Sequence, residues 1–111
     1  MINYFVMPAL RKYKNEIKLD SIVEIVTKYF NTNPVTVFSQ ARYKDMTTPR
    51  HLSYYFAIEF LNCTGIDLGK FFNRDRTTVI AGHKKIKNFL SIKDELTVKY
   101  VAEIKQILLG N

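Results

Sequence analysis

The sequence predicts an all-α fold, and three observations lead to that prediction. Apolar residues recur at intervals of three and four along much of the chain, which is the spacing of one face of a helix. Strand signals are missing from the sequence, because it contains neither Asn-Gly nor Asp-Gly and no sustained alternation of apolar and polar residues. Residues typical of helix starts, namely Pro, Ser, Thr and Asp, precede the periodic segments. At 111 residues the chain is expected to form one domain.

The charge balance favours a polyanionic partner. The chain has 17 Lys and Arg against 10 Asp and Glu, a formal net charge of +7. Such a surplus in a small domain most often serves nucleic-acid binding, and a basic surface that binds nothing is the alternative. The single cysteine excludes an internal disulfide and fits a reducing compartment. The sequence has neither a secretory signal pattern nor an apolar run approaching the ~20 residues of a membrane span, so a cytoplasmic, nucleoid-associated protein is expected.

The first 19 residues are expected to form an arm, and residues 20–111 the helical domain. The stretch INYFVMPAL is apolar enough to pack against something, and Pro8 disfavours a helix through its middle. An extended arm lying on its own domain is one interpretation. An arm that swaps onto a second copy, giving self-association, is the other.

A first helix is expected from residue 21, because Ser21 and Glu24 have the spacing of a capping box. Asn33 and Pro34 predict a second, short helix over residues 34–40, with proline at its first position. Apolar residues of the first helix recur at i, i+3, i+4, i+7 and i+8, which predicts one buried face. They are Ile22, Ile25, Val26, Tyr29 and Phe30.

A loop is expected over residues 41–48, which are basic and have little apolar periodicity. Thr48 and Pro49 then predict the start of a central helix, with proline in the first turn behind a hydroxyl cap. Residues 50–63 are apolar nearly all round, so this helix is expected to be the most buried one. Gly65 is expected at its C-terminal cap.

Residues 66–72 predict a helix of about two turns, followed by a turn at Asn73 and Arg74. Asp75 is expected to cap the next helix by accepting backbone N–H bonds, and this helix is expected to run to about residue 90.

A second capping pattern, Ser91-x-x-Asp94, predicts a final helix that Gly110 closes. One face of this helix is expected to be buried. It carries Val101, Ile104 and Leu108.

Two helices joined by a short turn, the second one polar and basic at its start, form the layout of a helix-turn-helix. Gly82 costs ~1 kcal/mol relative to alanine inside a helix, so a close contact with another helix is expected there. The solvent face of this second helix offers a guanidinium for guanine, hydroxyl and methyl groups for thymine, and a lysine for phosphate. The expected core face is Val79, His83, Ile86 and Leu90, and the expected solvent face is Arg76, Thr77, Ile80, Ala81 and Lys84.

The stretch FNRDRTTVIAGHKKI resembles the signature of the C-terminal DNA-binding domain of the bacterial replication initiator DnaA, commonly F-G-G-R-D-H-T-T-V-x-H-A-x-x-K-I. The likeness covers roughly residues 20–90, including the basic loop that ends in Pro-Arg. It implies a Trp-repressor-like helix-turn-helix that recognises double-stranded, A/T-rich DnaA boxes, with the loop in the minor groove. This chain has Arg76 where the family has histidine, and Asn73 in place of a glycine pair. These departures concern the box sequence rather than DNA binding.

The resemblance and the chemistry of the exposed face together predict which residues meet DNA. The resemblance supplies most of these roles, whereas the roles of Arg76, His51 and Lys84 follow from their side-chain chemistry. The expected base contacts are Asp75, Arg76, Thr77, Lys44 and Arg42, and the expected phosphate contacts are Arg50, His51, Thr78 and Lys84.

Neither a cofactor nor a metal site nor a catalytic site is expected. The stretch GIDLGKF lacks the glycine spacing and the hydroxyl of a phosphate-binding loop. His51, His83 and Cys63 have no metal-ligand spacing, and His83 is expected at the edge of the core. The seven tyrosines and eight phenylalanines lie mostly at core spacing, which favours packing over base stacking.

Two classes of function follow. The first is a non-enzymatic, sequence-specific DNA-binding module, a regulator of replication or transcription such as a mobile element would carry. The second is a protein–protein adaptor, in which the apolar arm docks a partner and the basic face is incidental.

Overall fold

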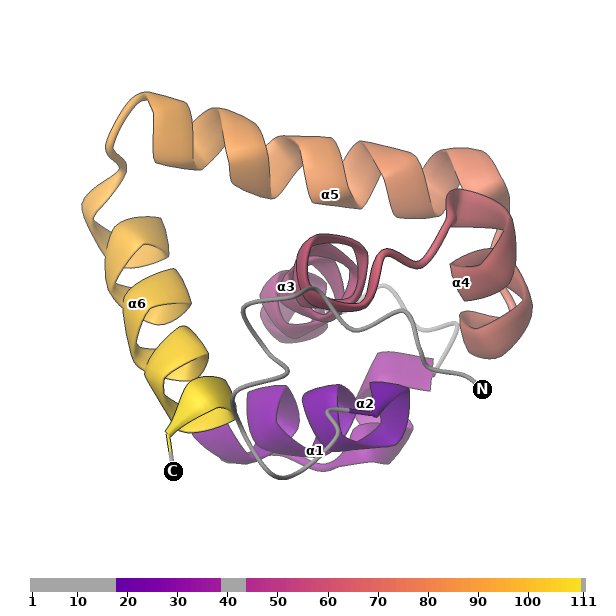
Figure 1. Ribbon diagram of the computed structural model, residues 1–111, viewed down its shortest axis with the longest axis horizontal. Coiled ribbons are helices and arrows are strands. Elements are labelled where there is room, and N and C mark those ends of the chain that lie inside the picture. Colours follow the sequence, from indigo (N-terminus) through magenta and orange to yellow (C-terminus); the bar gives the residue numbers. More distant parts are fainter. Residues whose placement is uncertain (1–17, 39–43, 111) are drawn as a thin grey trace.

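The computed structural model describes residues 18–38 and 44–110, and these residues form six helices and no strand (Figure 1). The all-α prediction is therefore confirmed. The helices are α1 (Leu19–Tyr29), α2 (Pro34–Phe38), α3 (Lys44–Leu61), α4 (Gly65–Phe72), α5 (Arg76–Ser91) and α6 (Glu95–Leu109).

Helix α3 lies in the middle of the fold, seen nearly end-on in Figure 1. Helices α1 and α2 pack on one side of it and α5 on the other, while α4 and α6 lie to the right and left of it in this view. This arrangement confirms that α3 is the central helix. The buried apolar core draws on all six helices and comprises Ile22, Val23, Val26, Val37, Leu52, Tyr54, Phe56, Ala57, Leu68, Phe72, Val79, Ile86 and Ile104.

Helix α1 begins earlier than its sequence signal indicated. Its N-cap is Lys18, whose side chain makes no capping bond, and Ser21 lies inside the helix, so the predicted capping box is wrong. Leu19 packs against the core. Burial of apolar area there outweighs a serine cap, which contributes only ~1 kcal/mol. Residues 1–17, most of the predicted arm, lie outside the described residues.

The short helix α2 starts at Pro34 as predicted and is described to Phe38, while residues 39 and 40 of its predicted range lie outside the described residues. The Asn33 side-chain carbonyl accepts a hydrogen bond from the backbone N–H of Val35 at 3.0 Å. This bond satisfies one of the amides that a helix start leaves open, and Pro34 has no amide to satisfy.

Residues 41–43 of the expected loop lie outside the described residues. For residues 44–48 the expectation is wrong, because α3 begins at Lys44 and contains Pro49. Proline inside a helix removes one intrahelical hydrogen bond. Here Pro49 is buried, and its carbonyl accepts a hydrogen bond from the Ser53 hydroxyl at 2.9 Å. Packing of this turn therefore retains a helical conformation that proline by itself disfavours.

Gly65 begins α4 and does not cap α3, which corrects the prediction. Helix α3 ends at Leu61, and Asn62 takes the left-handed conformation with φ 59°. The hydroxyl of Thr64 accepts a hydrogen bond from the Asp67 amide at 3.0 Å, and the Asp67 carboxylate accepts one from the Thr64 amide at 3.3 Å. These two bonds form a capping box, the signal that sequence reading missed in this segment.

The start of α6 is also corrected. Asp94 is its N-cap and accepts a hydrogen bond from the Thr97 amide at 3.1 Å. Ser91 instead ends α5, where its hydroxyl donates to the Asn88 carbonyl at 2.7 Å. The predicted end of α6 at Gly110 is confirmed.

Helix α6 packs back onto α1. Ile104 is fully buried, and the Tyr29 hydroxyl hydrogen-bonds to the Glu103 carboxylate. Burial, together with this bond to Glu103, raises the pKa of Tyr29 to about 12. The rings of Tyr29, Phe30 and Tyr100 meet edge to face, with centroids 4.9 to 5.9 Å apart. The predicted inner face is confirmed, since Val101 and Leu108 also pack against the core.

Candidate nucleic-acid interface

Helices α4 and α5 are joined by the tight turn Asn73–Asp75. Asn73 takes the left-handed conformation with φ 56°, and the Arg74 amide donates to the Gly69 carbonyl at 2.8 Å. A Cβ atom at Gly69 would lie 2.7 Å from the Arg74 carbonyl oxygen, so the turn requires glycine at that position. The predicted turn at Asn73 and Arg74 is confirmed.

Asp75 occupies the N-cap position of α5, as predicted, but its side chain makes no capping hydrogen bond. The expectation that its carboxylate accepts backbone N–H bonds is therefore wrong. The side chain is exposed. A carboxylate at this place can accept a hydrogen bond from an outside donor, such as the cytosine amino group.

Helix α5 has the two faces that the sequence predicted. Val79 and Ile86 are buried, and His83 and Leu90 are half-buried. The opposite face is polar and basic, with three exposed apolar side chains, Ile80, Ala81 and Phe89. Its other exposed residues include Arg76, Thr77, Thr78, Lys84, Lys85, Lys87 and Asn88.

Gly82 lets α5 lie close against α3, as its position inside a helix indicated. A Cβ atom at residue 82 would lie 2.7 Å from Cδ2 of His51 and 2.8 Å from Cδ2 of Tyr54. Both atoms belong to aromatic rings packed in the fold. The glycine thus fixes how deeply α5 sits on α3 and how far its outer face projects.

His83 lies at the edge of the core, as predicted. Its Nε2 atom is 2.8 Å from Oε2 of Glu59 on α3, and its ring stacks on that of Tyr55 with centroids 5.8 Å apart. Within residues 18–38 and 44–110, no group of three or more His, Cys, Asp or Glu side chains could hold a metal ion. The contacts with Glu59 and Tyr55 place His83 between α5 and α3.

Arg50 and His51 belong to α3, and both are less exposed than their expected role as phosphate contacts implies. Arg50 is only 8% exposed, and burial, followed by the positive charge of Arg74, lowers its pKa. Burial also lowers the pKa of His51, and the charges of Lys85 and Arg50 lower it further. His51 therefore favours its neutral form.

Arg74 was not predicted as a site residue, yet it lies beside Arg50 at the helix-turn-helix turn. It is half-buried and hydrogen-bonds to Tyr54. Its guanidinium also approaches the Val37 carbonyl on α2, at 3.5 Å. In the sequence, the one signal that could have pointed to Arg74 was its positive charge within the predicted turn.

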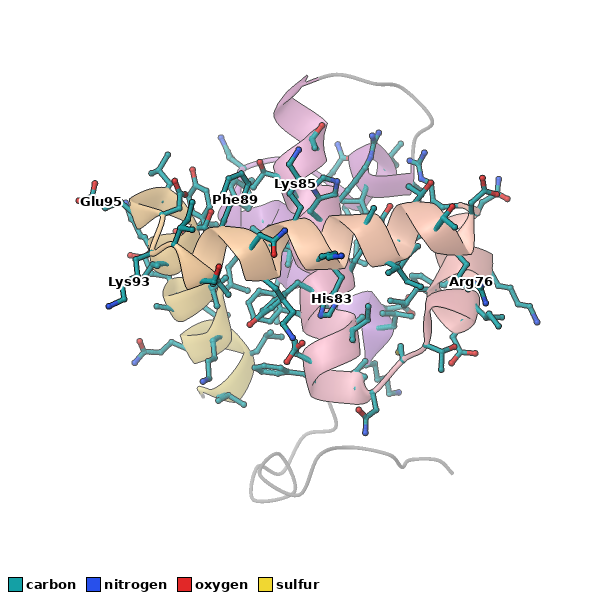
Figure 2. All side chains as sticks on the ribbon, turned by 90° about the horizontal axis from the view of Figure 1, so that it is seen from above. Arg76, His83, Lys85, Phe89, Lys93 and Glu95 are labelled. Carbon is teal, nitrogen blue, oxygen red and sulfur yellow. The ribbon has the colours of Figure 1, made fainter. Side chains whose placement is uncertain are left out.

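The loop residues cannot be placed in the same way. Arg42 lies outside the described residues, and Lys44 is the first residue of α3, with its side chain outside the described part. Of the remaining predicted residues, His51 lies at the crossing of α3 with α5, Arg50 beside Arg74 of the turn, and Lys84 on the exposed face of α5. The others lie at the start of α5, namely Asp75, Arg76, Thr77 and Thr78. Figure 2 shows Arg76 at the α4 end of α5, Lys85 along its length, and Lys93 beyond its far end.

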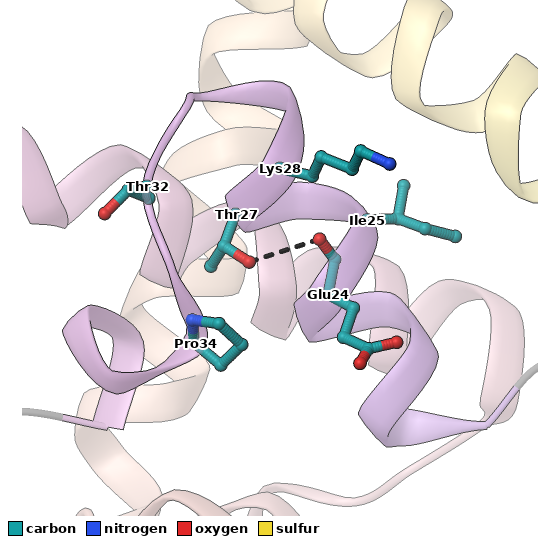
Figure 3. A pocket seen from close by; sticks show the side chains of 6 residues that line it. All are labelled: Glu24, Ile25, Thr27, Lys28, Thr32 and Pro34. Carbon is teal, nitrogen blue, oxygen red and sulfur yellow. Dashed lines mark hydrogen bonds between the residues drawn. The ribbon is translucent and has the colours of Figure 1, made fainter.

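A hollow lies away from this face, between α1 and the turn to α2 (Figure 3). The Thr27 hydroxyl at its wall donates to the carbonyls of Val23 at 2.8 Å and Glu24 at 3.2 Å. Because α1 and α5 pack on opposite sides of α3, the hollow is not part of the interface. It is lined by Glu24, Ile25, Thr27, Lys28, Thr32 and Pro34.

The described part of the chain contains no helix that is both long and apolar enough to cross a membrane.

Helix α4, the tight turn and α5, supported by α3, define a helix-turn-helix domain whose second helix presents a basic, polar outer face. The chain belongs to the family described as the bacterial dnaA protein helix-turn-helix, whose profile matches residues 19–86. This match confirms the resemblance that the motif residues carried.

Several full-length proteins are similar to this chain. The chromosomal replication initiator protein DnaA of Thermoanaerobacter sp. (strain X514) is 34% identical over 95 residues, which cover 86% of this chain. Its counterpart in Enterococcus faecalis is 35% identical over 96 residues, and that in the Wolbachia of Brugia malayi is 30% identical over 102 residues. In each case the match covers 21% of the relative, so the chain spans about a fifth of their length.

Proposed function

We propose that this protein binds double-stranded DNA in a sequence-specific way, with the start of α5 in the major groove. The observation that carries the proposal is the division of α5 into a face packed on α3 and an exposed face of basic and polar residues. A recognition helix needs this division, because one face must be held rigidly while the other reads base edges. Membership of the dnaA helix-turn-helix family supports A/T-rich, DnaA-box-like sites as the target.

The first turn of α5 carries the proposed base contacts. Asp75, Arg76 and Thr77 are all exposed there. A carboxylate can accept from cytosine, a guanidinium can donate twice to guanine, and a threonine methyl can meet the thymine methyl. Thr78 and Lys84, also exposed, are proposed to contact phosphates, which position the helix without reading sequence.

Arg50 and His51 are proposed to add phosphate contacts from α3. Their partial burial means that a phosphate there would meet a preorganised group rather than a freely rotating one, which lowers the entropic cost of the contact. The roles of Arg42 and Lys44 in the minor groove rest on the family resemblance alone.

The proposed role of the protein is regulation of replication or transcription at such sites, in the cytoplasm with the nucleoid. It requires neither a cofactor nor a chemical step, so added ATP and magnesium are expected to leave the melting temperature unchanged. The adaptor alternative depends on residues 1–19, of which 1–17 lie outside the described residues, and nothing in the structure favours it.

Fluorescence anisotropy with a labelled A/T-rich duplex, at two salt concentrations, tests the proposal. Binding through phosphates must weaken as salt rises, and duplex must compete better than a single strand of equal length. Selection from a random duplex pool then yields the preferred site. Equal competition by single strands, or affinity that does not change with salt, would refute this function.

A further inference from the structure

Gly65, the first residue of α4, lies directly against the start of α5. A Cβ atom at residue 65 would lie 2.9 Å from Cγ of Arg76 and 3.0 Å from Cγ1 and Cδ1 of Ile80. Cγ is in the middle of the arginine side chain, so rotating the guanidinium end cannot relieve such a contact. Cγ of Arg76 and two carbons of Ile80 thus border the space that a Cβ atom at residue 65 would fill.

The backbone does not require glycine at this position. No glycine in the described ranges has a positive φ, and residue 65 lies within a regular first turn closed by the Thr64–Asp67 capping box. Glycine is also a poor helix former, by ~1 kcal/mol relative to alanine. The space it leaves for Arg76 and Ile80 is therefore the structural reason for glycine here.

Packing, rather than an ion pair, holds Arg76 in place. Within the described residues His83 pairs with Glu59, and Arg76 forms no salt bridge. Figure 2 shows Arg76 at the end of α5 that adjoins α4. Its stem lies against α4 while the residue as a whole is exposed.

We propose that Gly65 determines base specificity by positioning Arg76, although it touches no DNA itself. This inference rests on the proposed function. A bidentate arginine–guanine contact requires the guanidinium to approach in the plane of the base with two aligned donors, so a displaced stem loses the pair. Ile80, 45% exposed, is positioned by the same space, and its methyl groups can contact a thymine methyl.

The test is selection of bound sequences, with affinity measurements, for the wild type, Gly65→Ala, Arg76→Ala and the double variant. Arg76 and Ile80 are exposed and can move outward, unlike the buried ring of Tyr54 beside Gly82. Gly65→Ala is therefore expected to keep the helix content and the melting temperature, and to keep its affinity for a non-specific duplex. Its ratio of specific to non-specific affinity is expected to fall roughly tenfold, within the range of one lost bidentate pair. The preference should be lost at the same base positions as in Arg76→Ala.

The double variant isolates the mechanism. Without the arginine stem, adding Gly65→Ala to Arg76→Ala should cause no further loss at the base positions that Arg76 reads. Any further loss should fall at the position that Ile80 contacts. A second comparison keeps the arginine contact and removes the isoleucine contact. It sets Ile80→Ala beside the double variant of Ile80→Ala with Gly65→Ala, and the double variant should again lose about tenfold in specificity relative to Ile80→Ala. Ile66→Ala, an exposed neighbour in the same turn, is the matched control and should keep wild-type preference.

The outcomes separate this inference from the function on which it rests. If Arg76→Ala flattens the base preference while Gly65→Ala leaves it unchanged, Gly65 does not position Arg76 and the inference is overturned. If neither variant alters the preference, base readout by Arg76 fails instead. A loss in Gly65→Ala that is equal for every duplex would indicate damage to the fold and would also overturn the inference.

Discussion

Gly82 of α5 lies so close to Tyr54 of α3 that an added Cβ would be 2.8 Å from the tyrosine Cδ2 atom. Tyr54 is itself 1% exposed and packs edge to face on Phe72 of α4, with ring centroids 5.1 Å apart. The crossing of α3 and α5 is thus tied to the packing of α4. The position of the outer face of α5 depends on this single small residue.

Gly82→Ala is expected to destabilise the fold although alanine favours helices. Overpacking a well-filled contact costs about 1–3 kcal/mol, which exceeds the helix-propensity gain of ~1 kcal/mol. Urea denaturation measures the difference in free energy of unfolding. Thr77→Ala, at an exposed position of the same helix, is the control and should stay within about 0.5 kcal/mol of the wild type. A Gly82→Ala variant as stable as the wild type would contradict the close crossing.

Arg76→Ala is expected to flatten base preference at one or two positions of the selected site, by about 1–3 kcal/mol per lost pair. The reason is that Arg76 is exposed in the first turn of α5, where a guanidinium can reach guanine O6 and N7. Arg76→His restores the residue of the family signature and should shift preference towards the ordinary DnaA box. Selection from a random duplex pool checks both variants. Unchanged selected sequences in both would place base readout elsewhere.

Arg50→Ala is expected to weaken binding to all duplexes alike and to lower the salt slope by about one unit, because a phosphate contact carries no sequence information. Since Arg50 is 8% exposed, the variant should also lose folding stability. Affinity is therefore measured well below the melting temperature of the variant. Lys84→Ala, which removes an exposed charge, should weaken binding with little loss of stability. A change in base preference on removing Arg50 would argue against the phosphate role.

His51 predicts a pH dependence of stability. Burial, then Lys85 and Arg50, lower its folded-state pKa below the ordinary value of 6.5. The unfolded chain therefore binds the proton of His51 more readily than the folded protein does. The contribution of neutral His51 to the free energy of unfolding is fully present above pH 6.5 and is lost as pH falls through the folded-state pKa. His51→Gln should make the free energy of unfolding fall less steeply below pH 6.5 than in the wild type. Identical pH profiles for the two proteins would show that His51 does not titrate in this way.

The sequence predicted the helix class, the order of the helices and the two faces of α5, because apolar periodicity reports directly on burial. Helix ends were predicted less well. Pro49 suggested a start, whereas burial of its turn keeps it inside α3. Gly65 suggested an end, whereas the stronger Thr64–Asp67 capping box makes it a beginning. In both cases tertiary packing or a competing cap outweighed a local preference.

For the candidate site, the motif pointed to the exposed residues of α5 but not to their support. The partial burial of Arg50 and its closeness to Arg74 depend on contacts between residues 24 positions apart, which no local pattern encodes. The contact of Gly65 with Arg76 is likewise a product of the angle between α4 and α5. The base-contacting and phosphate-contacting assignments stay predictions until DNA binding is measured.

The return of α6 to α1 has a practical consequence for handling the protein. Helix α6 runs from the end of α5 to the α1 side of the molecule, so the end of α6 lies on the opposite side of the fold from the exposed face of α5 (Figure 1). A biotin, a fluorophore or a sensor-surface linker attached after Gly110 would therefore point the α5 face outward. Immobilised in that orientation, the protein would present the exposed face of α5 to duplexes flowing past it.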